Sequence, residues 1–151
     1  MSCQRWGHSN LFPMPTRTFA GVYASLAEIA EFVRFSIKDS TITATDQFSL
    51  ETAVDEAVSN IIEHAYQGEN KGTIRSQVNI GKESIKIILE DHGKPFDPSC
   101  IPVPSLHGKL KNRQNHGLGY YMMCQLVDDV TFDFNDKRNR LTLVKKFKKS
   151  V

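Results

Sequence analysis

Several features that define other protein classes are missing from this chain of 151 residues. No apolar run approaches the roughly 20 residues that a membrane-spanning helix needs. The N-terminal segment is polar and lacks the apolar stretch of a secretory signal peptide. Neither sign of charge dominates, because 19 Lys and Arg residues face 17 Asp and Glu residues and leave a net charge of +2. We therefore expect neither a membrane partner nor a nucleic acid partner.

Cysteine is also scarce. Cys3, Cys100 and Cys124 lie far apart in the sequence and form no C-x-x-C pair, and an odd number does not suit a disulfide framework. Reduced thiols are typical of the cytoplasm, and we expect a cytoplasmic protein.

The sequence does contain a regular succession of apolar patterns. Apolar residues at helical spacing predict three helices, and alternating or β-branched runs predict five strands. The predicted helices cover residues 26–39, 46–66 and 118–127, and the predicted strands cover 16–23, 73–80, 84–90, 130–134 and 141–147. Ser25 is the candidate N-cap of the first helix. This order predicts an α+β fold, a two-layer sandwich with the helices on one face of a mainly antiparallel sheet.

Two further segments differ in composition from the rest. Residues 1–15 contain Gly and Pro and are interpreted as a poorly ordered leader, so that residues 16–148 form the single domain. Residues 91–115 are rich in Pro, Gly and basic side chains. A loop of more than about 15 residues inside a compact domain is more often a lid or a binding loop than an accident, so this segment is a candidate functional loop.

Glu56 and Asn60 are the first candidate site residues. They lie four positions apart and therefore project from one face of the long predicted helix. A carboxylate beside a carboxamide is able to hold a hydroxyl or water with one group and a hydrated metal with the other. Taken alone, the pair is equally consistent with the solvated edge of an amphipathic helix.

Asp91 and Gly93 follow a predicted strand and form the second candidate. An Asp at this point presents an acceptor to a pocket, and Gly allows the backbone to approach a flat ligand closely. An ordinary turn, with Asp bonding to its own backbone, accounts for the same residues.

The third candidate, His116-Gly117-Leu118-Gly119, opens the last predicted helix. Backbone N–H groups at a helix N-terminus favour anions such as phosphate. The chain has no G-x-x-x-x-G-K-[ST] motif, and its glycine-rich turn follows a loop rather than a first strand, so neither a P-loop nor a Rossmann fingerprint is present. The alternative is a simple loop-to-helix junction.

Together, these three segments resemble the GHKL superfamily of ATP-binding domains, which includes those of gyrase, heat-shock chaperones and histidine kinases. Its N box resembles Glu56-x-x-x-Asn60, its G1 box resembles Asp91-x-Gly93-x-x-Phe96-Asp97, and its G2 box resembles Gly117-Leu118-Gly119. Within the superfamily, residues 16–148 are most similar to the small bacterial anti-sigma-factor serine kinases. The resemblance implies a Bergerat-type fold with an ATP lid between the G1 and G2 boxes.

The resemblance also implies a role for each candidate. Asn60 would bind Mg²⁺, Asp91 would accept a hydrogen bond from the adenine amino group of ATP, and Gly93 would let the base lie close. Glu56 would be the general base that takes the proton of a substrate serine. The G2 residues would give backbone donors to the phosphates, and His116, which stands where the family often has Gly, could still reach a phosphate. The lid cations Lys109, Lys111 and Arg113 could meet the phosphates, but a charged run in a loop is usually solvated, and at least two of them are more simply explained in that way.

The function implied by the resemblance is an ATP-dependent anti-sigma factor with protein serine kinase activity. Such a protein would phosphorylate an anti-anti-sigma partner of the STAS type and sequester a sigma factor. A homodimer is implied as well, and Phe32 and Phe35 on the first predicted helix give it weak support. Two alternatives stay open: a non-catalytic ATP-binding regulatory module, and the ATPase domain of a histidine kinase.

Overall fold

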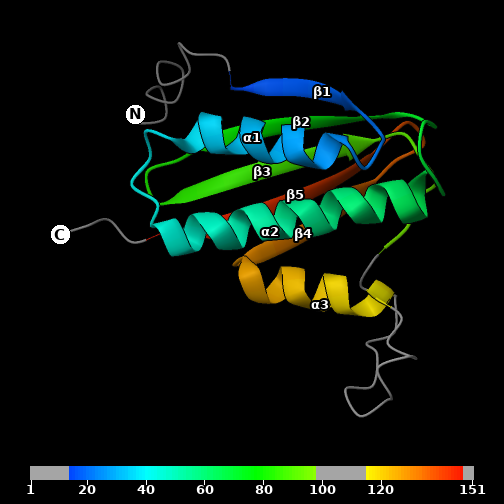
Figure 1. Cartoon of the computed structure of the whole chain (residues 1–151). Coiled ribbons are helices and arrows are strands. Elements are labelled where there is room, and N and C mark those ends of the chain that lie inside the picture. Colours follow the sequence, from blue (N-terminus) through cyan, green and yellow to red (C-terminus); the bar gives the residue numbers. More distant parts are fainter. Residues whose placement is uncertain (1–13, 98–114, 148–151) are drawn as a thin grey trace, which may run out of the picture.

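A five-stranded sheet covered by helices on one face makes up the molecule (Figure 1). The computed structural model of the chain describes residues 14–97 and 115–147, and for residues 115–118 it describes the backbone alone. The strands are β1 (Thr16–Ala20), β2 (Thr73–Ile80), β3 (Ser84–Asp91), β4 (Asp129–Phe134) and β5 (Asn139–Lys146). Their order in the sheet is β1-β2-β3-β5-β4, and all neighbouring pairs are antiparallel.

The helices are α1 (Ser25–Ile37), α2 (Ala44–Asn60) and α3 (Asn115–Leu126), and a π-helical turn, η2 (Ile61–Ala65), continues α2. Helix α1 lies over β1 and β2, α2 over the middle of the sheet near β5, and α3 beside β4 (Figure 1). The α+β two-layer sandwich predicted from the sequence is confirmed.

One hydrophobic core fills the space between the two layers. In β2 and β3 every second side chain is buried, as period-2 alternation requires when only one face of a sheet is covered. The fully buried apolar residues that face each other across the layers include Ile29, Val33, Leu50, Val54, Val58, Ile74, Val78, Ile85, Ile87, Leu89 and Leu143. Because α2 lies at the centre of this core, its C-terminal end has a fixed position relative to the ends of β3 and β5.

Several predicted element boundaries were wrong: β1 ends at Ala20 rather than at 23, α3 begins at Asn115 rather than at 118, and the starts of the first two helices were wrong for identifiable reasons. Ser25 does not cap α1: it is the first helical residue and is buried, and the N-cap position belongs to Ala24, which makes no side-chain cap bond. Helix α2 begins before the predicted start at residue 46, because Thr43 is its N-cap and accepts a hydrogen bond from the N–H of Asp46 at 3.1 Å. Threonine caps helix N-termini well, and the signal was present in the sequence.

The last turn of the long predicted helix is not α-helical. The N–H of Tyr66 donates to the carbonyl of Ile61 at 2.9 Å, which is the i to i+5 bond of a π-turn. Such turns occur mostly as single insertions in α-helices, often at functional sites. Gln67 and Gly68 then adopt positive φ angles of 56° and 138° and end the helix.

The predicted leader and loop fall largely outside the described residues. This applies to residues 1–13 of the leader and to residues 98–114, which include Lys109, Lys111 and Arg113. Among the helices that the structure describes, none has both the length and the apolar character needed to cross a membrane.

Candidate functional site

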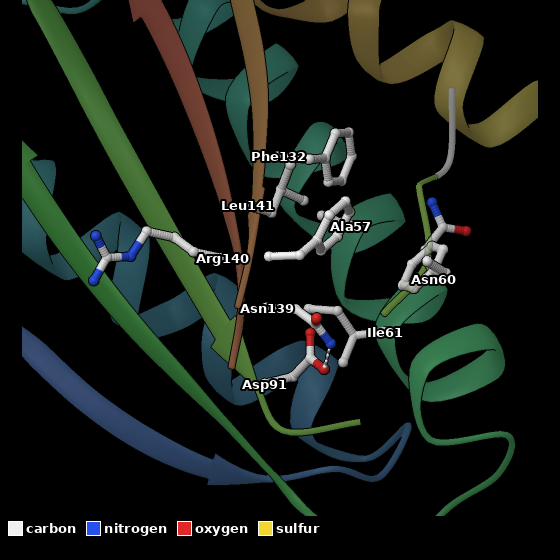
Figure 2. Close-up of a pocket in the computed structure, with 10 residues that line it drawn as sticks. Ala57, Asn60, Ile61, Asp91, Phe132, Asn139, Arg140 and Leu141 are labelled. Atoms are coloured by element: carbon white, nitrogen blue, oxygen red, sulfur yellow. Dashed lines mark hydrogen bonds between the residues drawn. The ribbon is translucent and has the colours of Figure 1, made fainter. Parts of the chain in front are cut away.

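A pocket lies where the C-terminal end of α2 meets the ends of β3 and the β4–β5 hairpin (Figure 2). Its walls are mainly apolar, with Ile61, Phe132 and Leu141 among them. The polar side chains that line it include Asn60 and Asp91, which sequence reasoning selected, and Asn139, which it did not. An apolar cleft with a few polar groups is the usual form of a small-ligand site.

Asp91 is the buried carboxylate of the pocket. It is the last residue of β3, it is 3% exposed, and its Oδ1 accepts hydrogen bonds from the N–H of Gly93 at 2.9 Å and from Asn139 Nδ2 at 2.8 Å. Burial raises the pKa of Asp91, although these two hydrogen bonds act in the opposite direction. Because both bonds go to Oδ1, Oδ2 keeps its capacity to accept a hydrogen bond from a ligand.

Asn139 holds this carboxylate in place. Its Nδ2 also donates to the carbonyl oxygens of Gly93 at 3.1 Å and Lys94 at 3.4 Å, so one amide group ties the end of β3 to the loop that follows it. Figure 2 shows Asn139 and Asp91 pointing toward each other from adjacent strands. In the sequence Asn139 lies between two predicted strands, and only the register of β3 on β5 reveals its role.

The loop after Asp91 packs on the π-turn. A Cβ atom on Gly93 would lie 2.5 Å from the backbone carbon and oxygen of Ala65 and 2.8 Å from its Cβ, so glycine is required here by space. The N–H of Lys94 donates to the carbonyl of Ala65 at 2.8 Å. Tyr66 adds a second attachment, because its hydroxyl accepts from the N–H of His92 at 3.0 Å and donates to the carbonyl of Thr73 at 2.5 Å.

Asn60 lines the pocket from the C-terminal end of α2, and Glu56 lies one turn earlier on the same helix. Asn60 is 5% exposed, and within the described part of the chain its Nδ2 has no hydrogen-bond partner. An amide nitrogen is a hydrogen-bond donor, so this buried and unused atom fits a site that an acceptor such as a ligand oxygen completes. Glu56 is half-buried, and its Oε2 would lie only 2.5 Å from a Cβ atom on Gly119.

The G2 segment lies inside α3, because the helix begins three residues before its predicted start at 118. Helix α3 begins at Asn115, so His116, Gly117 and Leu118 belong to its first turn and Gly119 follows directly. The first N–H groups of a helix have no partner within the helix and attract anions. The side chain of His116 lies outside the described part, so its contact with a phosphate stays a prediction.

Arg140 contributes no positive charge to the pocket that its backbone lines. Its guanidinium donates to Glu90 Oε1 at 2.9 Å and 2.6 Å, on the face of the sheet opposite the helices, and Figure 2 shows the side chain pointing away from the pocket. Among the described residues that line the pocket, Asp91 is therefore the single ionisable group whose charged end faces the pocket.

Comparison with known proteins agrees with this geometry. The profile of the histidine kinase-like ATPase domain family matches residues 19–145. The chain is 28% identical over 127 residues to an anti-sigma F factor of Clostridium novyi, covering 84% of this chain and 87% of that protein. It is 32% identical over 98 residues to the serine-protein kinase RsbW of Bacillus velezensis, covering 62% of this chain and 61% of that protein.

A solved structure shares the fold. It contains the RsbU and RsbW domains of a Mycobacterium tuberculosis protein and superposes with a TM-score of 0.61 at 16% identity, covering 89% of this chain and 33% of that one. The profile match extends over most of the chain and includes the C-terminal end of α2, the end of β3 and the β4–β5 hairpin, which line the pocket. The chain belongs to the histidine kinase-like ATPase domain family.

Proposed function

We propose that this protein is an ATP-dependent anti-sigma factor with protein serine kinase activity. The observation that carries the proposal is that Asn60 of α2 and the buried carboxylate of Asp91 line one pocket, with Glu56 one helical turn before Asn60 on the same face of α2. Relatives named anti-sigma F factor and serine-protein kinase support the class of activity. The substrate is the serine of an anti-anti-sigma protein of the STAS type, the sequestered partner is a sigma factor, and the location is the cytoplasm.

ATP recognition begins with the base. Asp91 Oδ2 accepts a hydrogen bond from the adenine amino group, while Asn139 and the Gly93 N–H keep Oδ1 fixed. The apolar walls, with Ile61 and Leu141 among them, enclose the base and exclude water. Gly117, Leu118 and Gly119 at the start of α3 give backbone donors to the phosphates.

Chemistry takes place on the α2 side. Asn60 supplies a carboxamide oxygen to Mg²⁺, which in this class of reaction neutralises charge on the phosphates. Glu56 accepts the proton of the serine hydroxyl while the serine Oγ bonds to the γ-phosphorus. The bond from the γ-phosphorus to the oxygen it shares with the β-phosphate breaks, and the products are phosphoserine and ADP.

The roles of Glu56 and Asn60 are separable by experiment. Glu56→Ala should bind ATP normally, because the carboxylate serves the attacking hydroxyl, and should transfer phosphate roughly 10²–10⁴-fold more slowly, the usual loss for a general base. Asn60→Ala should lose both nucleotide affinity and transfer. Calorimetry with ATP and Mg²⁺, together with transfer of labelled phosphate to a STAS-type partner, measures the two properties.

Asp55→Ala is the matched control, because Asp55 is an exposed carboxylate next to Glu56 on the same helix. It should change neither property by more than about twofold, since surface substitutions away from a site have small effects. Wild-type transfer by Glu56→Ala would contradict the role of Glu56. ATP binding without any transfer by the wild type would favour a module in which ATP only shapes the partner-binding surface.

A homodimer through β1 and α1 is part of the proposal. Phe35 on α1 is 67% exposed, and it lines a groove with Arg17 of β1 and with Glu28, Glu31 and Phe32 of α1. Light scattering at micromolar concentration should give twice the 17.1 kDa mass of the chain. A mass of one chain, in the presence and absence of ATP, would contradict it.

A further inference from the structure

Gly119 of α3 and Glu56 of α2 lie in direct contact across two helices. A Cβ atom on Gly119 would lie 2.5 Å from Glu56 Oε2 and 3.5 Å from Glu56 Cδ. Real side chains essentially never approach so closely, so the Glu56 carboxylate occupies the space that a side chain at Gly119 would need. Gly119 is itself buried, which places this contact inside the packed junction of α2 and α3.

We propose that Gly119 is a positioning residue for Glu56, because its missing side chain leaves the space in which the carboxylate of the general base lies. This inference rests on the proposed kinase function and deepens it. Helix α3 therefore determines where the general base stands relative to the substrate hydroxyl. Displacement of a catalytic group by about 1 Å commonly lowers a rate by about 10²-fold.

The atom that meets Gly119 is the far end of a flexible side chain, whereas the neighbours of Gly93 are backbone atoms. A methyl group at Gly119 would therefore turn the carboxylate away by a change of Glu56 rotamer and leave the backbone of both helices in place. Alanine also forms helices better than glycine, so Gly119→Ala should unfold at the same temperature as the wild type or higher.

The phosphate-binding role proposed for Gly119 depends on its backbone N–H and not on its missing side chain. Alanine keeps the backbone N–H that such a role requires, so Gly119→Ala should bind ATP within about twofold of the wild type, as expected for a change that spares the nucleotide contacts. Phosphate transfer should nevertheless fall about 10–100-fold. A loss of rate without a loss of affinity identifies positioning of the base, and equal losses of both would overturn the proposal.

Double variants test the contact itself. In a Glu56→Ala background, Gly119→Ala should cause no further loss of transfer, because the displaced group is already absent. In a Glu56→Asp background it should cost less than about twofold, because the side chain is one methylene shorter and ends before the added methyl group. Additive losses in the Glu56→Ala background would overturn the proposal. Met122→Ala, an exposed position on the same helix, is the control and should leave transfer unchanged.

A measurement that needs no activity separates this proposal from the proposed function. Carboxyl-carbon NMR of Glu56 in the full chain, with and without ATP, should show a displaced resonance in Gly119→Ala and an unchanged one in Met122→Ala. An unchanged Glu56 resonance in Gly119→Ala would overturn the contact. If the wild type transferred no phosphate, the kinase function would be contradicted. If the Glu56 resonance were nevertheless displaced in Gly119→Ala, Gly119 would still be the residue that places Glu56.

Discussion

The two sides of the pocket are built from different kinds of contact. On the side that we propose receives the adenine base, Gly93 lies against backbone atoms of Ala65, and backbone or buried amide groups hold the loop after β3. On the side that we propose is catalytic, Gly119 lies against the movable end of the Glu56 side chain. A methyl group added at Gly93 would have no space to occupy. A methyl group added at Gly119 would find space, because the Glu56 side chain is able to rotate away.

This difference determines which properties a mutation changes together. Where backbone meets backbone, a substitution alters the fold and the ligand contacts at once, because the same atoms serve both. Where a side chain meets a glycine, a substitution alters chemistry and leaves the fold intact. The base-binding side should therefore show coupled losses of stability and affinity, and the catalytic side should show a loss of rate alone.

Gly93→Ala should have the largest effect and is the strongest test of this comparison. The added Cβ atom would lie 2.5 Å from two backbone atoms of Ala65, so the loop or the π-turn must move. We expect a loss of about 3 kcal/mol or more in the free energy of unfolding, the upper end of the cost of overpacking. ATP affinity should fall with it. Urea unfolding and calorimetry measure both, and a Gly93→Ala protein as stable as Gly119→Ala would break the distinction.

Asp91→Asn should weaken ATP binding by about 1.5–3 kcal/mol, because an amide nitrogen in place of Oδ2 faces the adenine amino group with a donor instead of an acceptor. The amide oxygen is still able to accept from Gly93 and Asn139 in the place of Oδ1. Calorimetry gives the affinity. An unchanged dissociation constant would reduce Asp91 to a turn residue.

The same variant has a defined pH dependence of stability. Because burial raises the pKa of Asp91 above the ordinary value of an aspartate, the fold favours the protonated form. The contribution of protonated Asp91 to the free energy of unfolding is fully present below the pKa that Asp91 has in the unfolded chain. This contribution is lost as the pH rises through the higher pKa that Asp91 has in the folded protein. At neutral pH, Asp91→Asn should therefore be at least as stable as the wild type, and this advantage should shrink as the pH is lowered toward 3.8. Urea midpoints across this range measure it, and an advantage that grows in acid would contradict it.

Tyr66→Phe should have the smallest effect. It removes the hydroxyl that accepts from the N–H of His92 and donates to the carbonyl of Thr73, but keeps the ring. The expected loss is about 1 kcal/mol in the free energy of unfolding, as for one typical hydrogen bond. The packing of Gly93 on Ala65 remains, so ATP affinity should change less than in either variant above. A loss of stability as large as that of Gly93→Ala would show that the hydroxyl, not the packing, holds the loop.

The sequence predicted those features that depend on local pattern. The layers of the fold, the position of α2 and the common face of Glu56 and Asn60 follow from periodicity, because side-chain direction repeats with the backbone. The G1 and G2 segments were located by residue type and order. The assignment of roles to these residues came from a resemblance, and it stays a proposal.

The features that were missed depend on pairing between distant segments. Asn139 carries no local signal, because its role exists only when β5 pairs with β3 in the register that sets it opposite Asp91. The contact of Gly119 with Glu56 likewise requires α2 and α3 to pack together. In the π-turn after Asn60 the backbone hydrogen bond spans one residue more than in an α-helix. Apolar spacing over so few residues does not reveal this difference.

The strand order has a consequence for the assembly of the site during folding. Strand β5 lies between β3 and β4, so the hydrogen bond from Asn139 to Asp91 joins residues that are 48 positions apart in the chain. Pairings between such distant segments form late, because a long stretch of chain must first be closed into a loop. During synthesis, β3 therefore waits for one of its two neighbours until β5 has left the ribosome. A nascent chain without β5 has neither the amide that orients Asp91 nor one wall of the pocket, so nucleotide has no completed site to bind until β5 has paired with β3.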